Sequence, residues 1–170
     1  PLSLEEFLKL CSKNWRHNFN RAKKNNLLVQ EWKNPSYEKI ISVYNEMEDY
    51  KKLNSFYSKE ELEHLFSKCS KNIILYSCEN KEKELLGLRG CIVFNRKAWD
   101  LFAANTKKGR KVYASYALFG KLISHCSEIG VNIYDFGGID PLLNQGVYNF
   151  KKGTGSSIVE YLGEWDWATS

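Results

Sequence analysis

The sequence has little proline, histidine or methionine, and it lacks any long apolar run. Its 170 residues include 3 prolines and 1 methionine, and no internal repeat or low-complexity tract occurs. No apolar run approaches the roughly 20 residues that a membrane-spanning helix requires. The 3 histidines are isolated, and neither an HExxH motif nor a CxxC pair is present, which argues against a metal enzyme.

The cysteines are few and irregularly spaced. There are five of them, at Cys11, Cys69, Cys78, Cys91 and Cys126. An odd number without a regular framework argues against a secreted, disulfide-bonded protein. Most have apolar neighbours, so we expect small core residues in a reducing, cytoplasmic setting.

The length and composition predict one folded domain with a mild positive charge. Hydrophobic residues make up 43% and aromatic residues 14%, so disorder is not expected. The net charge of +5 permits an anionic partner, although an ordinary solvated surface would carry the same balance. The chain begins at Pro1 without an initiator methionine or signal peptide, and we interpret it as a piece of a longer or processed protein.

Helix signals dominate the first 70 residues. Ser3 and Ser58 each stand three residues before a glutamate, which is the capping-box pattern of a helix start. Apolar residues at helical spacing then predict helices over residues 4–22, 37–50 and 58–69. Residues 27–32 alternate loosely and predict a short strand.

The pattern changes to strands after residue 72. Three strands in an antiparallel meander are followed by a basic loop at 105–111, and Gly87 and Gly90 are candidate bulge positions. A largely apolar helix then leads to a strand that we expect to be parallel to its neighbour. A helical turn over 147–152 and a last strand over 157–161 complete an α/β (α+β) fold with a mixed, mostly antiparallel sheet. The three meander strands, the apolar helix and the parallel strand are expected over residues 73–77, 85–94, 99–104, 112–128 and 131–136.

The last quarter of the chain carries the clearest functional signal. The apolar strand ends in the pair Gly137–Gly138, which leaves backbone groups open to a ligand because no Cβ blocks the approach. The helical turn that follows carries Phe150, Lys151 and Lys152. A cation there can face negative charge that develops at the strand end, as in a group-transfer site.

Several segments resemble the Fem-type peptidyltransferases and related acyltransferases of the GNAT fold. The resemblance extends over nearly the whole chain and is most specific at the C-terminal end. The matching segments are WRHNFNRAKKN (15–25), FYSKEE (56–61), SYAL (115–118), YDFGG (134–138), FK (150–151) and GEWD (163–166).

This resemblance implies a reaction and several roles. It implies transfer of an aminoacyl group from aminoacyl-tRNA to a primary amine of a cell-wall precursor, with no tightly bound cofactor. The Phe-Lys pair of those enzymes falls on Phe150 and Lys151, and their acceptor-binding cations fall near Lys51 and Lys52. The type members carry two such folds, whereas this chain accommodates one, so the resemblance implies a second domain in the full-length protein.

Two other functions stay open. An acyl-CoA-dependent enzyme would acetylate an amino sugar or polysaccharide precursor, but its phosphate loop usually has several glycines, and Lys107–Lys111 has one. The other open function is that of a non-catalytic module, which would bind tRNA or a cell-wall precursor. We expect Lys107, Lys108, Arg110 and Lys111 to contact donor phosphate or tRNA, unless they form only a solvated loop. Four further cations either contact tRNA or form an ordinary solvated face of a helix. They are Arg16, Arg21, Lys23 and Lys24.

Acyl transfer assigns roles to the remaining candidates. Lys151 is expected to stabilise negative charge, and the competing interpretation is a solvated helix lysine. Asp135 either orients or deprotonates the acceptor amine, or it caps a helix or pairs with an arginine. Gly137 and Gly138 either admit substrate or form a tight turn. Tyr134, Tyr148 and Phe150 are the candidates for lining the substrate site. No Ser-His-Asp or Cys-His arrangement is apparent, which favours direct attack over a covalent intermediate.

Overall fold

The computed structural model of the chain describes residues 3–51 and 57–160. Among these residues, no helix has both the length and the apolar character needed to cross a bilayer. The elements in chain order are α1 (Leu4–Leu10), α2 (Lys13–Lys23), β1 (Leu28–Glu31), α3 (Tyr37–Lys51), α4 (Lys59–Cys69), β2 (Ile73–Glu79), β3 (Leu85–Phe94), β4 (Lys97–Asn105), α5 (Lys107–Lys111), α6 (Ala114–Glu128), β5 (Ile133–Asp135) and α7 (Gln145–Gly153).

Local capping explains where the first helices begin. Both predicted capping boxes are present, with Ser3 and Ser58 accepting from the amides of Glu6 and Glu61. The prediction of one helix over residues 4–22 is wrong, because the chain breaks between α1 and α2. Ser12 caps α2 by accepting from the Trp15 amide, and its own amide donates to the Gly153 carbonyl of α7 at 2.8 Å.

The five strands form one sheet in the order β1-β2-β3-β4-β5. Every neighbouring pair is antiparallel except β4 and β5, which are parallel as predicted. The register shifts beside both candidate glycines. Next to Gly87, Leu86 is the extra residue of β3 opposite β2, whereas opposite Gly90 and Cys91 the extra residue is Leu101 of β4. The predicted α/β class with a mixed, mostly antiparallel sheet is confirmed.

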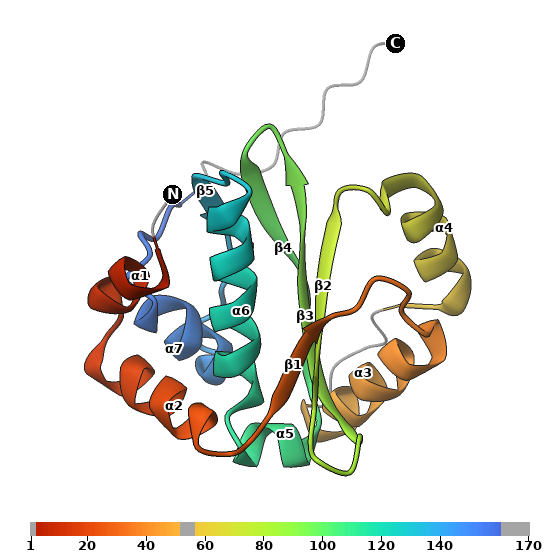
Figure 1. Cartoon of the computed structure of the whole chain (residues 1–170), viewed down its shortest axis with the longest axis horizontal. Coiled ribbons are helices and arrows are strands. Elements are labelled where there is room, and N and C mark those ends of the chain that lie inside the picture. Colours follow the sequence, from red (N-terminus) through yellow and green to blue (C-terminus); the bar gives the residue numbers. More distant parts are fainter. Residues whose placement is uncertain (1–2, 52–56, 161–170) are drawn as a thin grey trace.

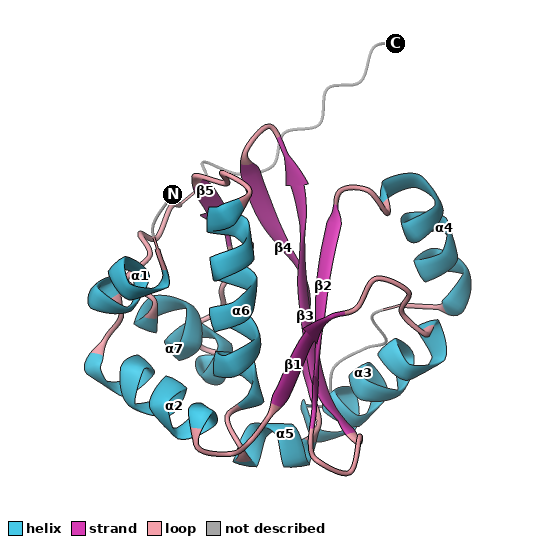
Figure 2. Ribbon diagram, viewed as in Figure 1, coloured by secondary structure: helices cyan, strands magenta, loops and turns pink. Residues whose placement is uncertain are grey.

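Helices cover both faces of the sheet. In Figure 1, α3 and α4 lie on one side, and α1, α2, α6 and α7 lie on the other (Figure 2 shows the same layers by element type). The α6 helix lies between the sheet and the outer helices, and its Leu118, Phe119 and Leu122 are fully buried. All five cysteines have free thiols and four are buried, which confirms that they are mostly small core residues.

Two predicted segments differ from the structure. The basic stretch after β4 is the short helix α5, because the Thr106 side chain accepts from the Gly109 amide and caps it. The predicted strand at 157–161 is wrong for its described residues, 157–160, which pair with no described strand. Ile158 and Val159 are exposed there, so the β-branched pair did not make a strand without a hydrogen-bonding neighbour among the described residues.

Two glycines in short helices test the packing of α5. A Cβ added to Gly109 would lie 2.0 Å from the Leu86 carbonyl oxygen, whereas one added to Gly146 in α7 would meet no atom within 4 Å. We therefore expect Gly109→Ala to lower the free energy of unfolding by about 1–3 kcal/mol through overpacking. Gly146→Ala should raise it by about 0.4–1 kcal/mol, because alanine restricts the unfolded chain. Chemical denaturation measures both, and equal effects would contradict the close packing of α5 on β3.

Candidate active site

The candidate site lies where β4 and β5 separate. The two strands pair only over Lys97–Trp99 and Ile133–Asp135, and β4 then continues to Asn105 paired with β3 alone. The chain leaves β5 through Gly137, whose φ of +66° favours glycine. A Cβ on Gly137 or Gly138 would meet nothing within 4 Å, so the glycine pair combines a turn with an open approach.

The ammonium group of Lys151 lies directly beside this glycine pair. Its Nζ atom donates to the carbonyl oxygens of Phe136 at 2.6 Å and of Gly138 at 2.7 Å. A lysine ammonium has three donors, and the described residues offer no hydrogen-bonding partner for the third. Lys151 is therefore a half-buried cation anchored to the end of β5, and the alternative of a freely solvated helix lysine does not fit these contacts.

The charges around Lys151 oppose one another. Burial lowers the pKa of Lys151 because it disfavours the charged form. The carboxylate of Asp100 raises this pKa, the guanidinium of Arg89 lowers it, and the carboxylate of Asp135 raises it. The two carboxylates therefore partly offset the effect of burial on the pKa of Lys151.

A buried charge network behind Lys151 was not predicted from the sequence. Arg89 on β3 is 5% exposed, and its Nη2 atom lies 2.7 Å from the Asp100 carboxylate on β4. The Tyr134 hydroxyl donates to the other oxygen of Asp100 at 2.7 Å. One signal was available: Arg89 is the only charged residue in its strand, LLGLRGCIVF.

Aromatic rings enclose this network. The Arg89 guanidinium lies 4.9 Å from the ring centres of both Phe119 and Phe150, and 5.9 Å from that of Phe136. Phe150 also contacts Tyr116, at 5.1 Å between ring centres, so the residue before Lys151 belongs to the aromatic core. This packing fixes the backbone of α7 beside the glycine pair.

Asp135 has partners of its own at the end of β5. Its carboxylate lies 3.1 Å from the Lys97 ammonium and accepts from the Gly137 amide at 2.9 Å. The hydrogen bond from the Gly137 amide lowers the pKa of Asp135, and the positive charges of Lys97 and Lys151 lower it further. Asp135 therefore stays ionised at neutral pH, and it shapes the turn at Gly137.

The other predicted site residues make their described contacts with groups other than Lys151, or they lie outside the described residues. Tyr148 faces Lys152, whose Nζ atom is 5.4 Å from the ring centre. Lys108 pairs with Glu84, and Arg110 donates to the Asn105 carbonyl. Lys107 and Lys111 are exposed on α5. Lys51 ends α3 but its side chain is not described, and Lys52 lies outside the described residues.

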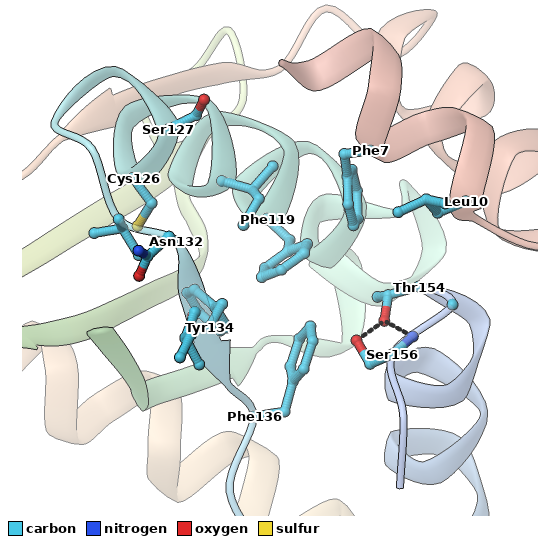
Figure 3. A pocket seen from close by; sticks show the side chains of 14 residues that line it. Phe7, Leu10, Phe119, Cys126, Ser127, Asn132, Tyr134, Phe136, Thr154 and Ser156 are labelled. Atoms are coloured by element: carbon cyan, nitrogen blue, oxygen red, sulfur yellow. Dashed lines mark hydrogen bonds between the residues drawn. The ribbon is translucent and has the colours of Figure 1, made fainter. Parts of the chain in front are cut away.

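A cavity of about 260 Å³ adjoins the site on the side of α1. Figure 3 shows the rings of Phe119, Tyr134 and Phe136 converging on it, with Thr154 and Ser156 at the opposite wall. Phe136 thus has the cavity on its ring side, while its carbonyl oxygen holds Lys151. The lining is mostly apolar and aromatic, which suits an apolar group better than a phosphate.

Similar structures share this fold. The crystal structure of FemX matches with a TM-score of 0.72 at 14% sequence identity, over 91% of this chain and 56% of the FemX chain. The chain therefore spans about half of FemX. An acetyltransferase of the GNAT family from Staphylococcus aureus Mu50 matches with a TM-score of 0.59 at 19% identity, over 75% of this chain and 83% of that one. An aminoglycoside acetyltransferase from an uncultured soil metagenomic sample matches with a TM-score of 0.63 at 15% identity, over 86% of this chain and 98% of that one.

These likenesses show the GNAT-type fold, which agrees with the resemblance found in the sequence. Comparison with curated proteins gives no significant match. The model of the FemAB family matches residues 58–170, which is more than half of the chain and includes the glycine pair and the Phe150–Lys151 pair. The chain belongs to the FemAB family.

Proposed function

We propose that this chain is an acyltransferase that moves an acyl group onto a primary amine by direct attack. Membership of the FemAB family and the fold shared with acetyltransferases support an acyl transfer. The observation that carries the proposal is the position of the Lys151 ammonium, which is held by the Phe136 and Gly138 carbonyls where β4 and β5 separate.

The chemistry assigns a role to this ammonium. When the amine attacks the acyl carbonyl, negative charge develops first on the carbonyl oxygen and then on the departing oxygen or sulfur atom. Two donors of Lys151 are bound to backbone carbonyls, so its position is fixed before substrate arrives. The third donor is left for the developing charge, and partial burial strengthens this interaction because the local dielectric is low.

Asp135 fits an orienting role better than a basic one. A carboxylate whose pKa is lowered by the Gly137 amide is a weak base. Its charge can still hold the incoming ammonium form of the acceptor near the end of β5. Water, or another group of the complex between protein, donor and acceptor, then removes the proton from the acceptor ammonium.

We propose aminoacyl-tRNA as the donor and an amine of a cell-wall precursor as the acceptor, with no tightly bound cofactor. The alternative donor, acyl-CoA, needs a glycine-rich turn whose amides face a pyrophosphate. Gly109, the one glycine of the basic segment, is buried against the Leu86 carbonyl, so it serves packing between α5 and β3. This contact favours the tRNA donor over acyl-CoA.

Replacement of Lys151 tests the proposed reaction. We expect Lys151→Ala to lower the rate of the chemical step at least ~10²-fold, because removal of one charge-stabilising donor has that effect. Transfer of a labelled aminoacyl group from tRNA to a panel of amines measures the rate, and circular dichroism checks the fold. Lys152→Ala is the matched control, since its ammonium faces Tyr148 and should leave turnover unchanged. Near-normal turnover by the Lys151 variant would refute the assignment.

The pH profile tests the charge balance around Lys151. Asp100→Asn removes a carboxylate that favours the ammonium, while Arg89 on β3 still disfavours it and Asp135 on β5 still favours it. The pKa of Lys151 should fall further, and the high-pH limb of the transfer rate should move to lower pH. Asp140→Asn is the control. The Asp140 carboxylate accepts from the Leu142 and Leu143 amides. A limb that stays in place or moves to higher pH would show that Lys151 does not govern it.

A further inference from the structure

Acidic residues are absent from two long segments of the sequence. Residues 7–30 contain six lysines and arginines and no aspartate or glutamate, and residues 101–127 contain five and none. These segments hold eleven of the 25 cations, so the remainder of the chain holds fourteen cations and all 20 acids. The modest net charge of +5 therefore conceals a strongly uneven distribution.

The fold brings the two segments together. The Asn25 side chain, just after α2, donates to the Val112 carbonyl, just after α5, at 3.1 Å. The Arg21 guanidinium lies 4.4 Å from the ring centre of Tyr113. Figure 1 shows the end of α2 and the short α5 next to the start of α6. Cations that are more than 80 residues apart in the sequence thus share one surface.

We name this surface the basic face and define it by Arg21, Lys23, Lys24, Lys107 and Lys111. All five side chains are exposed. Lys107 and Lys111 are four residues apart on α5 and so lie on the same side of that helix. Two acids stand at its border, where Glu84 pairs with Lys108 and Glu46 accepts from the Lys107 amide.

The opposite side of the sheet has more acids than cations. The helices α3 and α4 cover that side, and their described side chains include five acids, Glu38, Glu46, Glu60, Glu61 and Glu63, and three lysines, Lys39, Lys59 and Lys68. One of these acids, Glu46, is the same acid that stands at the border of the basic face. An excess of cations on one side and a modest excess of acids on the other favour one orientation of an approaching polyanion.

We propose that the basic face is the docking surface for the RNA body of the donor; this rests on the proposed use of aminoacyl-tRNA. The phosphate backbone is the part of an RNA that exposed lysines and arginines bind without reading sequence. The cations are exposed and come from two separate helices, which fits contact with a backbone that extends beyond the protein.

The basic face stands at a suitable distance from Lys151. The β4 strand begins beside β5 at the candidate site and ends at Asn105, directly before α5. The six residue-to-residue steps from Trp99 to Asn105 span roughly 20 Å at about 3.4 Å per step. The aminoacyl ester of a tRNA is at the end of a single-stranded tail, so the tail can reach the site while the helical body contacts α2 and α5.

Binding of fluorescently labelled tRNA by the 170-residue chain, followed by anisotropy between roughly 50 and 200 mM KCl, tests the proposal. The variant combines Lys24→Gln, Lys107→Gln and Lys111→Gln. We expect its Kd to rise roughly tenfold or more at the lowest salt, and the slope of log K against log salt to become shallower by about 2 to 3 because three phosphate contacts are lost.

The matched control makes the same charge change on the opposite side of the sheet. It combines Lys39→Gln, Lys68→Gln and Lys71→Gln, all exposed, and it should leave both Kd and slope unchanged. Equal weakening in the two triple variants would overturn the proposal, because net charge alone would then explain binding. Absence of tRNA binding, or binding to phosphatidylglycerol vesicles in place of tRNA, would overturn it as well.

The Lys151→Ala variant separates this proposal from the proposed reaction. We expect it to bind tRNA with the affinity of the unaltered chain while it transfers no aminoacyl group. If Lys151→Ala abolishes transfer but the basic-face variant binds tRNA like its control, the reaction stands and the docking surface is wrong. If Lys151→Ala turns over normally while the basic-face variant loses tRNA, the docking surface stands and the reaction is wrong.

Discussion

The ion pair between Arg89 and Asp100 is the interaction on which the site depends. Both side chains are almost fully buried, and the pair joins β3 to β4. Removal of one partner from such a pair typically costs about 3–5 kcal/mol, because the other charge remains in the core without compensation. The Tyr134 hydroxyl extends the pair to β5, so one charge network ties together the three strands that lead to the site.

This network also determines how Lys151 is presented. The Arg89 guanidinium packs on Phe150, which directly precedes Lys151 on α7, and it lies near Phe136, whose carbonyl holds the ammonium. A cation with three possible donors and a long flexible stem would otherwise sample many positions. Here its location follows from rings packed around a buried charge, and the glycine pair leaves the approach to it open.

The sequence predicted what depends on local pattern. Capping serines marked the starts of α1 and α4, and apolar spacing marked α3 and α6, because these signals act within a few residues. Ser12 was overlooked as a cap, since apolar residues continue at helical spacing on both sides of it. The strand predicted at 157–161 failed because strand formation needs a partner that the pattern itself does not reveal.

The candidate site was predictable only where a motif was continuous. The proximity of Lys151 to Gly138 agrees with the placement expected from the Phe-Lys and glycine motifs. The network behind it was missed because Arg89, Asp100 and Tyr134 come from three different strands, and their meeting depends on sheet register. A lone arginine in an apolar strand indicated a buried charge, but the sequence did not identify the residue that pairs with it.

The attachment of α5 to the sheet has a consequence for affinity. Thr106 donates to the Leu86 carbonyl through both its amide and its hydroxyl, and Gly109 packs on the same residue, three positions before Arg89 in β3. The short helix is thus preorganised by the strand that bears the buried charge. A ligand that meets its lysines has no loop to order first, so it loses less conformational entropy on association.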